Sequence, residues 1–330
     1  MMSKRESACS QGELTLPCFL RGEKVKVDVI IPVYKPGKAL FELLHRLESQ
    51  TLIPQNIILM NTEEKYFEQL ISGTSFWEKY GNVKVYHLKE KDFDHGGTRH
   101  EGVLHSDAEV FVTMTQDAMP ADRKLIQNLI SGLSRDVAVA YARQLPGRKS
   151  DEMERISRHF NYPDESCVKT SADMDTLGIK TFFCSNVCAA YRRDVYDELG
   201  GFIRHTIFNE DMIYAAGAVK AGYGIAYQAE ARVIHSHNYT NLQQLRRNFD
   251  LGVSQADHPE VFGGIISESE GKKLVMEAWR YLKKENRLYC FPAFFLQSCF
   301  KYAGYLLGKH YRLLPSKWIL AITTNKSYWK

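Results

Sequence analysis

Apolar and polar positions alternate in a regular order along the first two-thirds of this 330-residue chain. Short runs of branched and aromatic residues, typical of buried strands, are separated by stretches with apolar residues every three or four positions, typical of amphipathic helices. We predict strands at 27–34, 56–60, 83–88, 109–115, 137–143, 181–191 and 224–234, and helices at 39–50, 66–80, 98–105, 123–133, 211–221, 242–251 and 272–284. Strands that alternate with helices indicate an α/β fold with a mostly parallel sheet flanked by helices.

Three segments depart from this alternation: residues 1–25, residues 145–178 and the C-terminal residues 257–330. Residues 1–25 are polar and irregular, which predicts a loose lead-in. Residues 145–178 are polar and weakly periodic, which predicts a mobile active-site loop with one helix near 151–160. We therefore expect one α/β domain over 26–256 and a separate helical region over 257–330.

The helical region mixes aromatic and aliphatic residues with cations, among them Phe295, Tyr302, Lys301, Lys309 and Arg312. This mixture suits an amphipathic helix lying on an anionic membrane surface. A terminal helix packed on the core, or a homodimer interface, would have a similar pattern. The sequence leaves these readings open.

Composition excludes several classes of protein. The hydrophobic content of 44% and charged content of 25% are ordinary for a globular protein, and a net charge of +4 without a basic run gives no reason to expect nucleic acid. The seven cysteines form no disulfide framework or zinc spacing, so we expect reduced thiols in a cytoplasmic protein. We expect neither a signal peptide nor a membrane-spanning helix.

Candidate metal ligands follow two of the predicted strands. Asp117 comes after the strand at 109–115, and His235 and His237 come after the strand at 224–234. Ligands of open α/β sheets bind at the carboxyl ends of strands, and a carboxylate suits a hard divalent cation. Asp117 could instead cap the following helix, and a lone histidine is usually structural. Two histidines at one strand end favour a function.

A second group of candidates precedes predicted helices. Glu210 and Asp211 open the helix at 211–221, where a carboxylate could accept a proton or simply cap the helix. The turn Gly96-Gly97 permits close approach to a ligand, and Arg99 beside it could contact phosphate. Arg247 could meet a diphosphate or lie on a solvated helix face.

Five motifs taken together resemble the family-2 glycosyltransferases, and within them the bacterial rhamnosyltransferases of cell-wall and O-antigen polysaccharides. The resemblance covers about residues 27–252. Each motif is weak alone, but all five occur in the expected order. They are Val29-Ile30-Ile31-Pro32-Val33-Tyr34, His95-Gly96-Gly97-Thr98-Arg99, Thr115-Gln116-Asp117-Ala118, Asn209-Glu210-Asp211 and His235-Ser236-His237-Asn238-Tyr239-Thr240.

The resemblance implies a Rossmann-like fold of GT-A type, a nucleotide-sugar donor and inversion at the anomeric carbon. It implies that Asp211 is the general base, with Glu210 beside it. Asp117 matches the metal-binding acid of the DxD motif, whose first acid is replaced by Thr115, and His235 or His237 matches the histidine near the metal, Mg²⁺ or Mn²⁺. The residues expected to hold the donor are Pro32, Val33, Tyr34, Thr62, His95, Gly96, Arg99, Gln116 and Arg247.

The resulting hypothesis is transfer of L-rhamnose from dTDP-L-rhamnose to a polyprenyl-linked glycan. The enzyme would be cytoplasmic and peripheral on the inner face of the plasma membrane. A UDP-hexose or UDP-N-acetylhexosamine donor is an alternative, as is a non-catalytic subunit of a polysaccharide assembly complex. A nucleotidyltransferase would be expected to show a Gly-rich, basic loop after the first strand, and residues 33–37 match one poorly.

Overall fold

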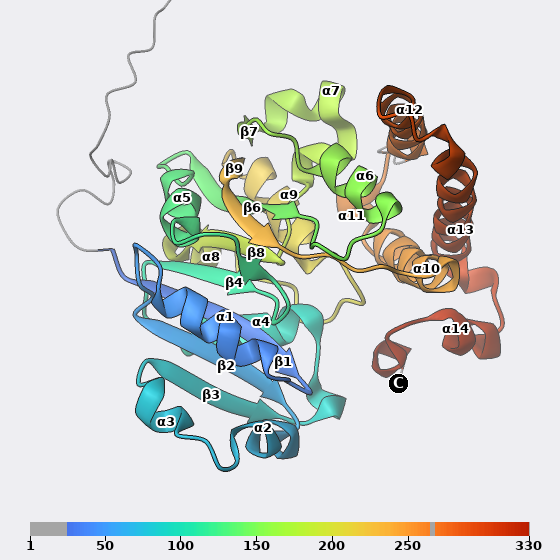
Figure 1. The fold of residues 1–330 in the computed structure, drawn as a ribbon. Helices are drawn as coiled ribbons and strands as arrows, with labels where there is room; N and C mark the ends of the chain where they lie inside the picture. The colour runs from blue at the N-terminus through green and yellow to red at the C-terminus, as the bar shows by residue number, and fades with distance from the viewer. Residues whose placement is uncertain (1–24, 265–267, 330) are drawn as a thin grey trace, which may run out of the picture.

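The computed structural model describes residues 25–264 and 268–329 (Figure 1), so the expected lead-in lies almost wholly outside the described residues. Within them, nine strands form one sheet in the order β3-β2-β1-β4-β8-β6-β9-β5, and β7 pairs with β9. The strands are β1 (Val27–Tyr34), β2 (Asn56–Thr62), β3 (Val83–Leu88), β4 (Val110–Met114), β5 (Met119–Pro120), β6 (Val137–Leu145), β7 (Cys167–Lys169), β8 (Cys188–Arg192) and β9 (Gly224–Ile234).

The sheet is parallel over its first four strands and mixed beyond them. β8 runs antiparallel to both β4 and β6, whereas β6 and β9 are parallel. The amino end of β8 therefore lies at the same edge as the carboxyl ends of β1, β4, β6 and β9. The predicted α/β architecture is confirmed, and its second half is less parallel than the alternation of elements suggested.

Helices cover both faces of the sheet (Figure 1). Alternate residues of β1 enter opposite clusters: Val29 and Ile31 pack with α1 and α5, and Ile30 packs on the other face with α4 and α9. This is the period of two that an extended strand imposes. The helices are α1 (Ala39–Glu48), α2 (Glu64–Ile71), α3 (Phe76–Lys79), α4 (His95–Leu104), α5 (Leu125–Ser131), α6 (Glu152–Asn161), α7 (Met174–Leu177), α8 (Arg193–Glu198) and α9 (Glu210–Lys220).

Two predicted elements differ in the structure. The helix expected at 66–80 is two helices, α2 and α3, separated by a turn in which Gly73 has φ +71°. The strand expected at 181–191 begins only at Cys188, and Gly178–Phe182 is a 3₁₀ helix. Thr181 and Phe182 are nevertheless buried, so the apolar run reports burial of the segment and not its conformation.

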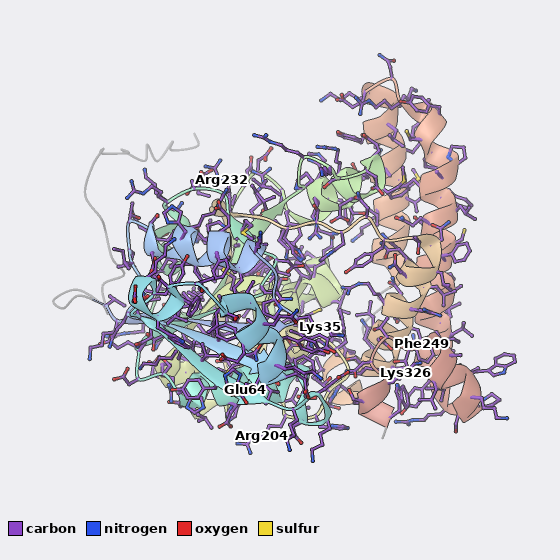
Figure 2. The ribbon with its side chains drawn as sticks, turned by 60° about the horizontal axis from the view of Figure 1, so that its bottom comes forward. Lys35, Glu64, Arg204, Arg232, Phe249 and Lys326 are labelled. Atoms are coloured by element: carbon purple, nitrogen blue, oxygen red, sulfur yellow. The ribbon has the colours of Figure 1, made fainter. Side chains whose placement is uncertain are left out.

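The C-terminal part is helical and packs on the domain through α10 (Asn241–Asp257). Gly304 and Gly308 of α13 (Phe291–Lys309) allow close contact, because an added Cβ would lie 2.1 Å from the Leu245 carbonyl oxygen and 2.0 Å from that of Phe249. Phe249, labelled in Figure 2, is fully buried there. The remaining helices are α11 (Pro259–Phe262), α12 (Glu268–Lys284) and α14 (Ser316–Ile322).

The predicted division at residue 256 stays a prediction, because α10 contributes to packing on both sides of it. Its residues Phe249 and Val253 share a cluster with Ile207 of the α/β part and Ile319 of α14. No helix in the described part of the chain is both long and apolar enough to cross a bilayer.

Candidate active site

Asp117, His235 and His237 come together where β4 and β9 end. Asp117 Oδ2 lies 3.1 Å from His237 Nε2, and Asp117 Oδ1 lies 3.5 Å from His235 Nε2. The two Nε2 atoms are 3.0 Å apart, and one ligand atom from each residue lies within 4.8 Å of the others. A carboxylate oxygen and two imidazole nitrogens that converge in this way could hold a divalent metal ion.

Gln144, at the end of β6, orients one of these imidazoles. Its Oε1 lies 3.0 Å from His235 Nδ1, and it also accepts a hydrogen bond from the Arg158 guanidinium. With Nδ1 donating to this oxygen, His235 presents the lone pair of Nε2 toward Asp117. A hydrogen bond to the second ring nitrogen is the usual way in which proteins fix the tautomer of a metal-binding histidine.

The protonation states of this group suit a metal ion. Burial would raise the pKa of Asp117, but its contacts with the His235 and His237 imidazoles outweigh burial and hold that pKa well below its usual range. Burial lowers the pKa of His235. An ionised carboxylate and a neutral imidazole are the forms that bind metal ions.

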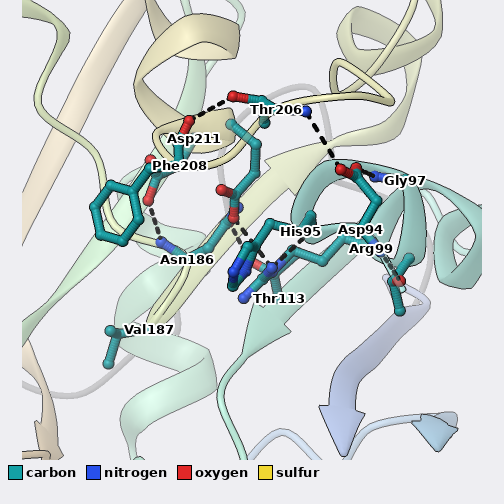
Figure 3. A network of polar contacts seen from close by, with 12 residues as sticks. Asp94, His95, Gly97, Arg99, Thr113, Asn186, Val187, Thr206, Phe208 and Asp211 are labelled. Atoms are coloured by element: carbon teal, nitrogen blue, oxygen red, sulfur yellow. Dashed lines mark hydrogen bonds and ion pairs between the residues drawn. The ribbon is translucent and has the colours of Figure 1, made fainter. Parts of the chain in front are cut away.

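Glu210 lies at the start of α9 and is held in a buried ion pair (Figure 3). Arg99 Nη1 lies 3.1 Å from Glu210 Oε1, and Asn186 Nδ2 donates to the same oxygen at 3.1 Å. Burial opposes ionisation of Glu210, but the Arg99 charge, followed by that of His95, keeps the pKa below its ordinary value. Glu210 is therefore a fixed negative charge.

Asp211, the next residue, is in a different state because its partners are different. Its carboxylate accepts hydrogen bonds from the backbone N–H groups of Asn186 (2.9 Å) and Met212 (2.8 Å), and no cation of the described residues forms an ion pair with it. Burial and the neighbouring Glu210 charge raise the pKa of Asp211 to about 7. Two adjacent carboxyls with pKa values pushed apart mark one of them, Asp211, as the group that can take up a proton near neutrality.

Asn186 joins both carboxylates and was not predicted as a site residue. Its side-chain oxygen accepts hydrogen bonds from Thr113 Oγ1 (2.6 Å) and the Tyr191 hydroxyl (2.7 Å), while its amide nitrogen donates to Glu210. It is 3% exposed, so each of these bonds replaces one to water. Its sequence signal is a polar residue inside an otherwise apolar run.

Gln144 also links the metal ligands to the acidic pair. Its Nε2 donates to Ser185 Oγ at 2.9 Å, and Ser185 precedes Asn186, whose N–H holds Asp211. The candidate metal ligands and the candidate base therefore share one continuous polar network.

The turn predicted at Gly96-Gly97 is instead the first turn of helix α4, where the glycines allow close packing. A Cβ on Gly96 would lie 1.8 Å from the Ile203 carbonyl oxygen, so only glycine allows the segment before α9 to approach. Asp94 caps α4 through a 2.6 Å bond from the Gly97 N–H and accepts from the Thr206 N–H at 3.3 Å (Figure 3). The structure thus uses this turn to hold α4 against the residues that precede Glu210.

Two of the residues expected to hold the donor lie within this packed region. Arg99 is buried, and it donates to the His95 carbonyl in addition to pairing with Glu210, so it has a partner other than a phosphate. His95 lies close enough to Glu210 to help ionise it, and burial lowers the pKa of His95 itself. The structure thus places both residues beside the acidic pair.

Four other predicted donor residues, Pro32, Val33, Tyr34 and Thr62, lie toward the ends of β1 and β2. Tyr34 pairs with Thr62 across the two strands, and its backbone N–H and carbonyl bond the Gln116 side-chain amide at 3.1 and 3.0 Å. Gln116 therefore ties β1 to the end of β4. Val33 is 1% exposed and lies in the core, which leaves only its backbone for a ligand, whereas Pro32 is half-buried.

Arg247 reaches the metal ligands through stacked rings. Its guanidinium lies 4.8 Å from the Tyr239 ring centre, and that ring stacks on His237 at 4.9 Å. The structure thus brings this predicted donor residue from α10 to the edge where β9 ends.

The amino-acid sequence of this chain is similar to a known protein family and to two of the proteins compared with it. Residues 28–200 match the model of glycosyl transferase family 2. The chain is 39% identical over 310 residues to the O-antigen chain rhamnosyltransferase RfbN of Salmonella typhimurium, covering 92% of this chain and 96% of that protein. It is 38% identical over 307 residues to the O-antigen chain rhamnosyltransferase WbaN of Salmonella anatum, covering 91% and 95%.

Among solved structures, the mannosyltransferase PcManGT from Pyrobaculum calidifontis, in complex with GDP-Man and Mn²⁺, is similar over 93% of this chain and 92% of its own. The TM-score is 0.60 and the sequence identity is 12%, a likeness of fold alone. It confirms the α/β architecture expected from the sequence.

Proposed function

This chain belongs to glycosyl transferase family 2, and from that premise we propose that it is an inverting rhamnosyltransferase of polysaccharide biosynthesis. The donor would be dTDP-L-rhamnose and the acceptor a lipid-linked glycan. The observation that carries this proposal is identity of 38–39%, over more than nine-tenths of the chain, to two O-antigen chain rhamnosyltransferases.

Asp211 supplies the base that inversion requires. An acceptor hydroxyl attacks the anomeric carbon, the new C–O bond forms as the bond to the diphosphate oxygen breaks, and the hydroxyl proton passes to Asp211. A pKa of about 7 suits a general base near neutral pH, and the backbone bonds from Asn186 and Met212 fix its orientation. Glu210, ionised against Arg99, sustains this raised pKa.

Asp117, His235 and His237 would hold a divalent cation, which would stabilise the negative charge on the departing nucleoside diphosphate. The donor set fits: one carboxylate, and two imidazole nitrogens of which one is oriented by Gln144. Two nitrogen ligands suit Mn²⁺ better than Mg²⁺, which prefers oxygen. Arg247, stacked over Tyr239, lies where it could share the diphosphate charge.

A lipid-linked acceptor places the enzyme at a membrane surface, and the C-terminal helices support this location. The exposed positions of α13 include Phe295, Leu296 and Tyr302, each about half exposed, which recur on one side of the helix. Residues 286–330 contain seven of the 43 Lys and Arg residues and none of the 39 Asp and Glu residues. An apolar surface with excess cations suits the anionic cytoplasmic leaflet. A symmetric dimer through this surface would oppose like charges.

The test is donor turnover. Purified protein is incubated with dTDP-rhamnose, UDP-glucose, UDP-galactose and a UDP-N-acetylhexosamine, with Mn²⁺, Mg²⁺ or EDTA, and released nucleoside diphosphate is measured. We expect metal-stimulated release from dTDP-rhamnose. Release from a UDP-sugar alone would show that the donor is that UDP-sugar and not dTDP-rhamnose. If no donor releases nucleoside diphosphate, even with a lipid-linked acceptor extract, the proposal is contradicted.

A further inference from the structure

Two open pockets lie next to each other near the end of β6, on the side of the polar network that holds the metal ligands. The smaller, of about 200 Å³, lies at the end of β6 and is lined by Arg143, Gln144, Arg155 and Arg158. The larger, of about 390 Å³, lies between α6 and α12, two helices that are neighbours in Figure 1. His159 and Tyr281 line both pockets, so the two lie side by side.

The smaller pocket is cationic. Three guanidinium groups line it, and no carboxylate does. Arg158 pairs with Glu154 at 2.7 Å and Arg143 pairs with Asp164, whose side chain is 74% exposed. Among the described residues, the hydrogen bonds of Arg155 go only to the Ser150 and Arg148 carbonyls, at 3.2 Å each. An anion is the ligand that such a group of guanidiniums binds.

The larger pocket has an apolar floor. Ile156, Phe160 and Ala278 line it together with Tyr281, and its polar residues include Lys284 and the ion pair of Arg280 with Glu277 at 2.5 Å. Ile156 and Ala278 also belong to the small apolar cluster that joins α6 to α12. A hydrocarbon chain could extend the packing of this cluster, and Lys284 at its rim would suit the anionic surface on which such a lipid would lie.

The position of the pockets separates them from the donor side. The predicted nucleotide residues lie at the ends of β1 and β2, whereas these pockets open at β6, beyond β4 and β8 in the sheet. Gln144 lines the smaller pocket and also bonds His235 and Ser185. A ligand in the smaller pocket would therefore contact Gln144, which in turn bonds the metal ligand His235 and Ser185, the residue before Asn186.

We propose that these two pockets bind the lipid diphosphate of the acceptor. The diphosphate would lie on Arg143, Arg155 and Arg158, and the first part of the hydrocarbon chain would lie against Ile156 and Phe160. The smaller pocket is below the ~300–1,000 Å³ usual for drug-sized ligands, which suits a compact headgroup and not a nucleotide sugar. This inference rests on the proposed function, which supplies the lipid-linked acceptor.

Binding of farnesyl diphosphate, measured by calorimetry in EDTA, tests the proposal without metal-bridged contacts. We expect it to bind more tightly than either pyrophosphate or farnesol, because each of these lacks one half of the ligand. The Arg155→Glu and Arg155→Ala variants should weaken binding at least about tenfold, which corresponds to about 1.4 kcal/mol. Arg135→Glu, an exposed arginine just before the opposite end of β6, should bind like the wild type.

Three outcomes would overturn the proposal. Competition by dTDP would place the lipid in the donor site. Equal affinity for pyrophosphate and farnesyl diphosphate would indicate a simple anion site. Unchanged binding in both folded Arg155 variants would show that the arginines of the smaller pocket do not bind the diphosphate. Melting temperatures show whether each variant is folded. Failure of the proposed function is distinct, since it would appear as loss of metal-stimulated donor turnover in the wild type.

Discussion

The adjacent carboxyls Glu210 and Asp211 show how one backbone step can separate two chemical roles. Glu210 faces Arg99 and remains charged, while Asp211 accepts hydrogen bonds from backbone N–H groups and is pushed toward protonation by burial and by the Glu210 charge. Asp211→Asn keeps the shape of the side chain and removes its basicity. We expect turnover to fall by ~10²–10⁴, the usual value of a positioned base, with dTDP affinity retained. Asp136→Asn, an exposed acid, is the control, and near-normal turnover in the first variant would exclude Asp211 as the base.

The raised pKa of Asp211 sets a pH dependence. The base must be deprotonated to act, so kcat/KM should rise with pH through about 7 and level off above it. Glu210→Gln removes the neighbouring charge that raises this pKa, so any residual activity should have its rising limb at lower pH. The measurement is a pH profile in saturating Mn²⁺. A limb that stays at the same pH in the Glu210 variant would assign it to another group.

Gln144 should control the affinity for the metal ion. Gln144→Leu deletes the acceptor for His235 Nδ1 and frees the ring to change tautomer. Loss of such an orienting bond typically weakens metal binding by ~10–100-fold. Mn²⁺ titration followed by electron paramagnetic resonance measures this directly, with the partly exposed Gln127 changed to Leu as a control for the substitution. Equal Mn²⁺ affinity in the two variants would contradict the orienting role.

The sequence pointed to the candidate metal ligands but not to the side chains that orient them. Asp117, His235 and His237 were predicted as candidate metal ligands because each follows a strand, and the structure brings the three together. Asn186 and Gln144 were missed, because an amide that orients another residue does not belong to a sequence motif with a characteristic spacing. Gln116 was expected beside the donor, and its amide ties β1 to β4, a contact across 82 residues of sequence.

Helix α4 and the segment before α9 approach so closely that Gly96 is required between them. Gly96→Ala would place a Cβ 1.8 Å from the Ile203 carbonyl oxygen, and backbone cannot yield as a flexible side chain does. We expect a loss of about 1–3 kcal/mol in the free energy of unfolding and lower turnover, because Arg99 and Glu210 would separate. Gly217→Ala in α9, where nothing lies within 4 Å of the added Cβ, should instead be neutral or stabilising. Denaturant unfolding compares the two, and equal effects would refute the packing account.

Elements with an unambiguous period were predicted with correct ends, such as β1, β3 and β9. The apolar run over 181–191 was not, because half of it is buried in a 3₁₀ helix and an irregular segment that carries Asn186 into the site. Burial without periodicity fits a strand and a packed loop equally well. The reversal of β8 was likewise invisible, since direction depends on pairings distant in sequence.

Charge is divided unequally along the chain. The last 45 residues contain seven Lys and Arg and no Asp or Glu, which leaves 36 Lys and Arg against 39 Asp and Glu in the rest of the chain. We expect the protein to pellet with anionic vesicles and not with neutral ones, and less so as salt rises. Lys317→Glu with Lys326→Glu should weaken this binding, whereas Lys84→Glu on β3 should not. Salt-independent pelleting, or equal behaviour of the two sets, would assign the α13–α14 surface to another contact.

The Gln144 side chain touches a metal ligand, a neighbour of the base and the arginine pocket at once. Its Oε1 is shared by His235 and Arg158, so a ligand that draws Arg158 away changes how firmly that oxygen holds the imidazole. Linkage is reciprocal: whatever factor the lipid diphosphate adds to Mn²⁺ affinity, Mn²⁺ must add to lipid affinity. A single amide would then make cofactor loading and acceptor capture cooperative, so that an enzyme built this way would cleave its donor faster once the acceptor has arrived.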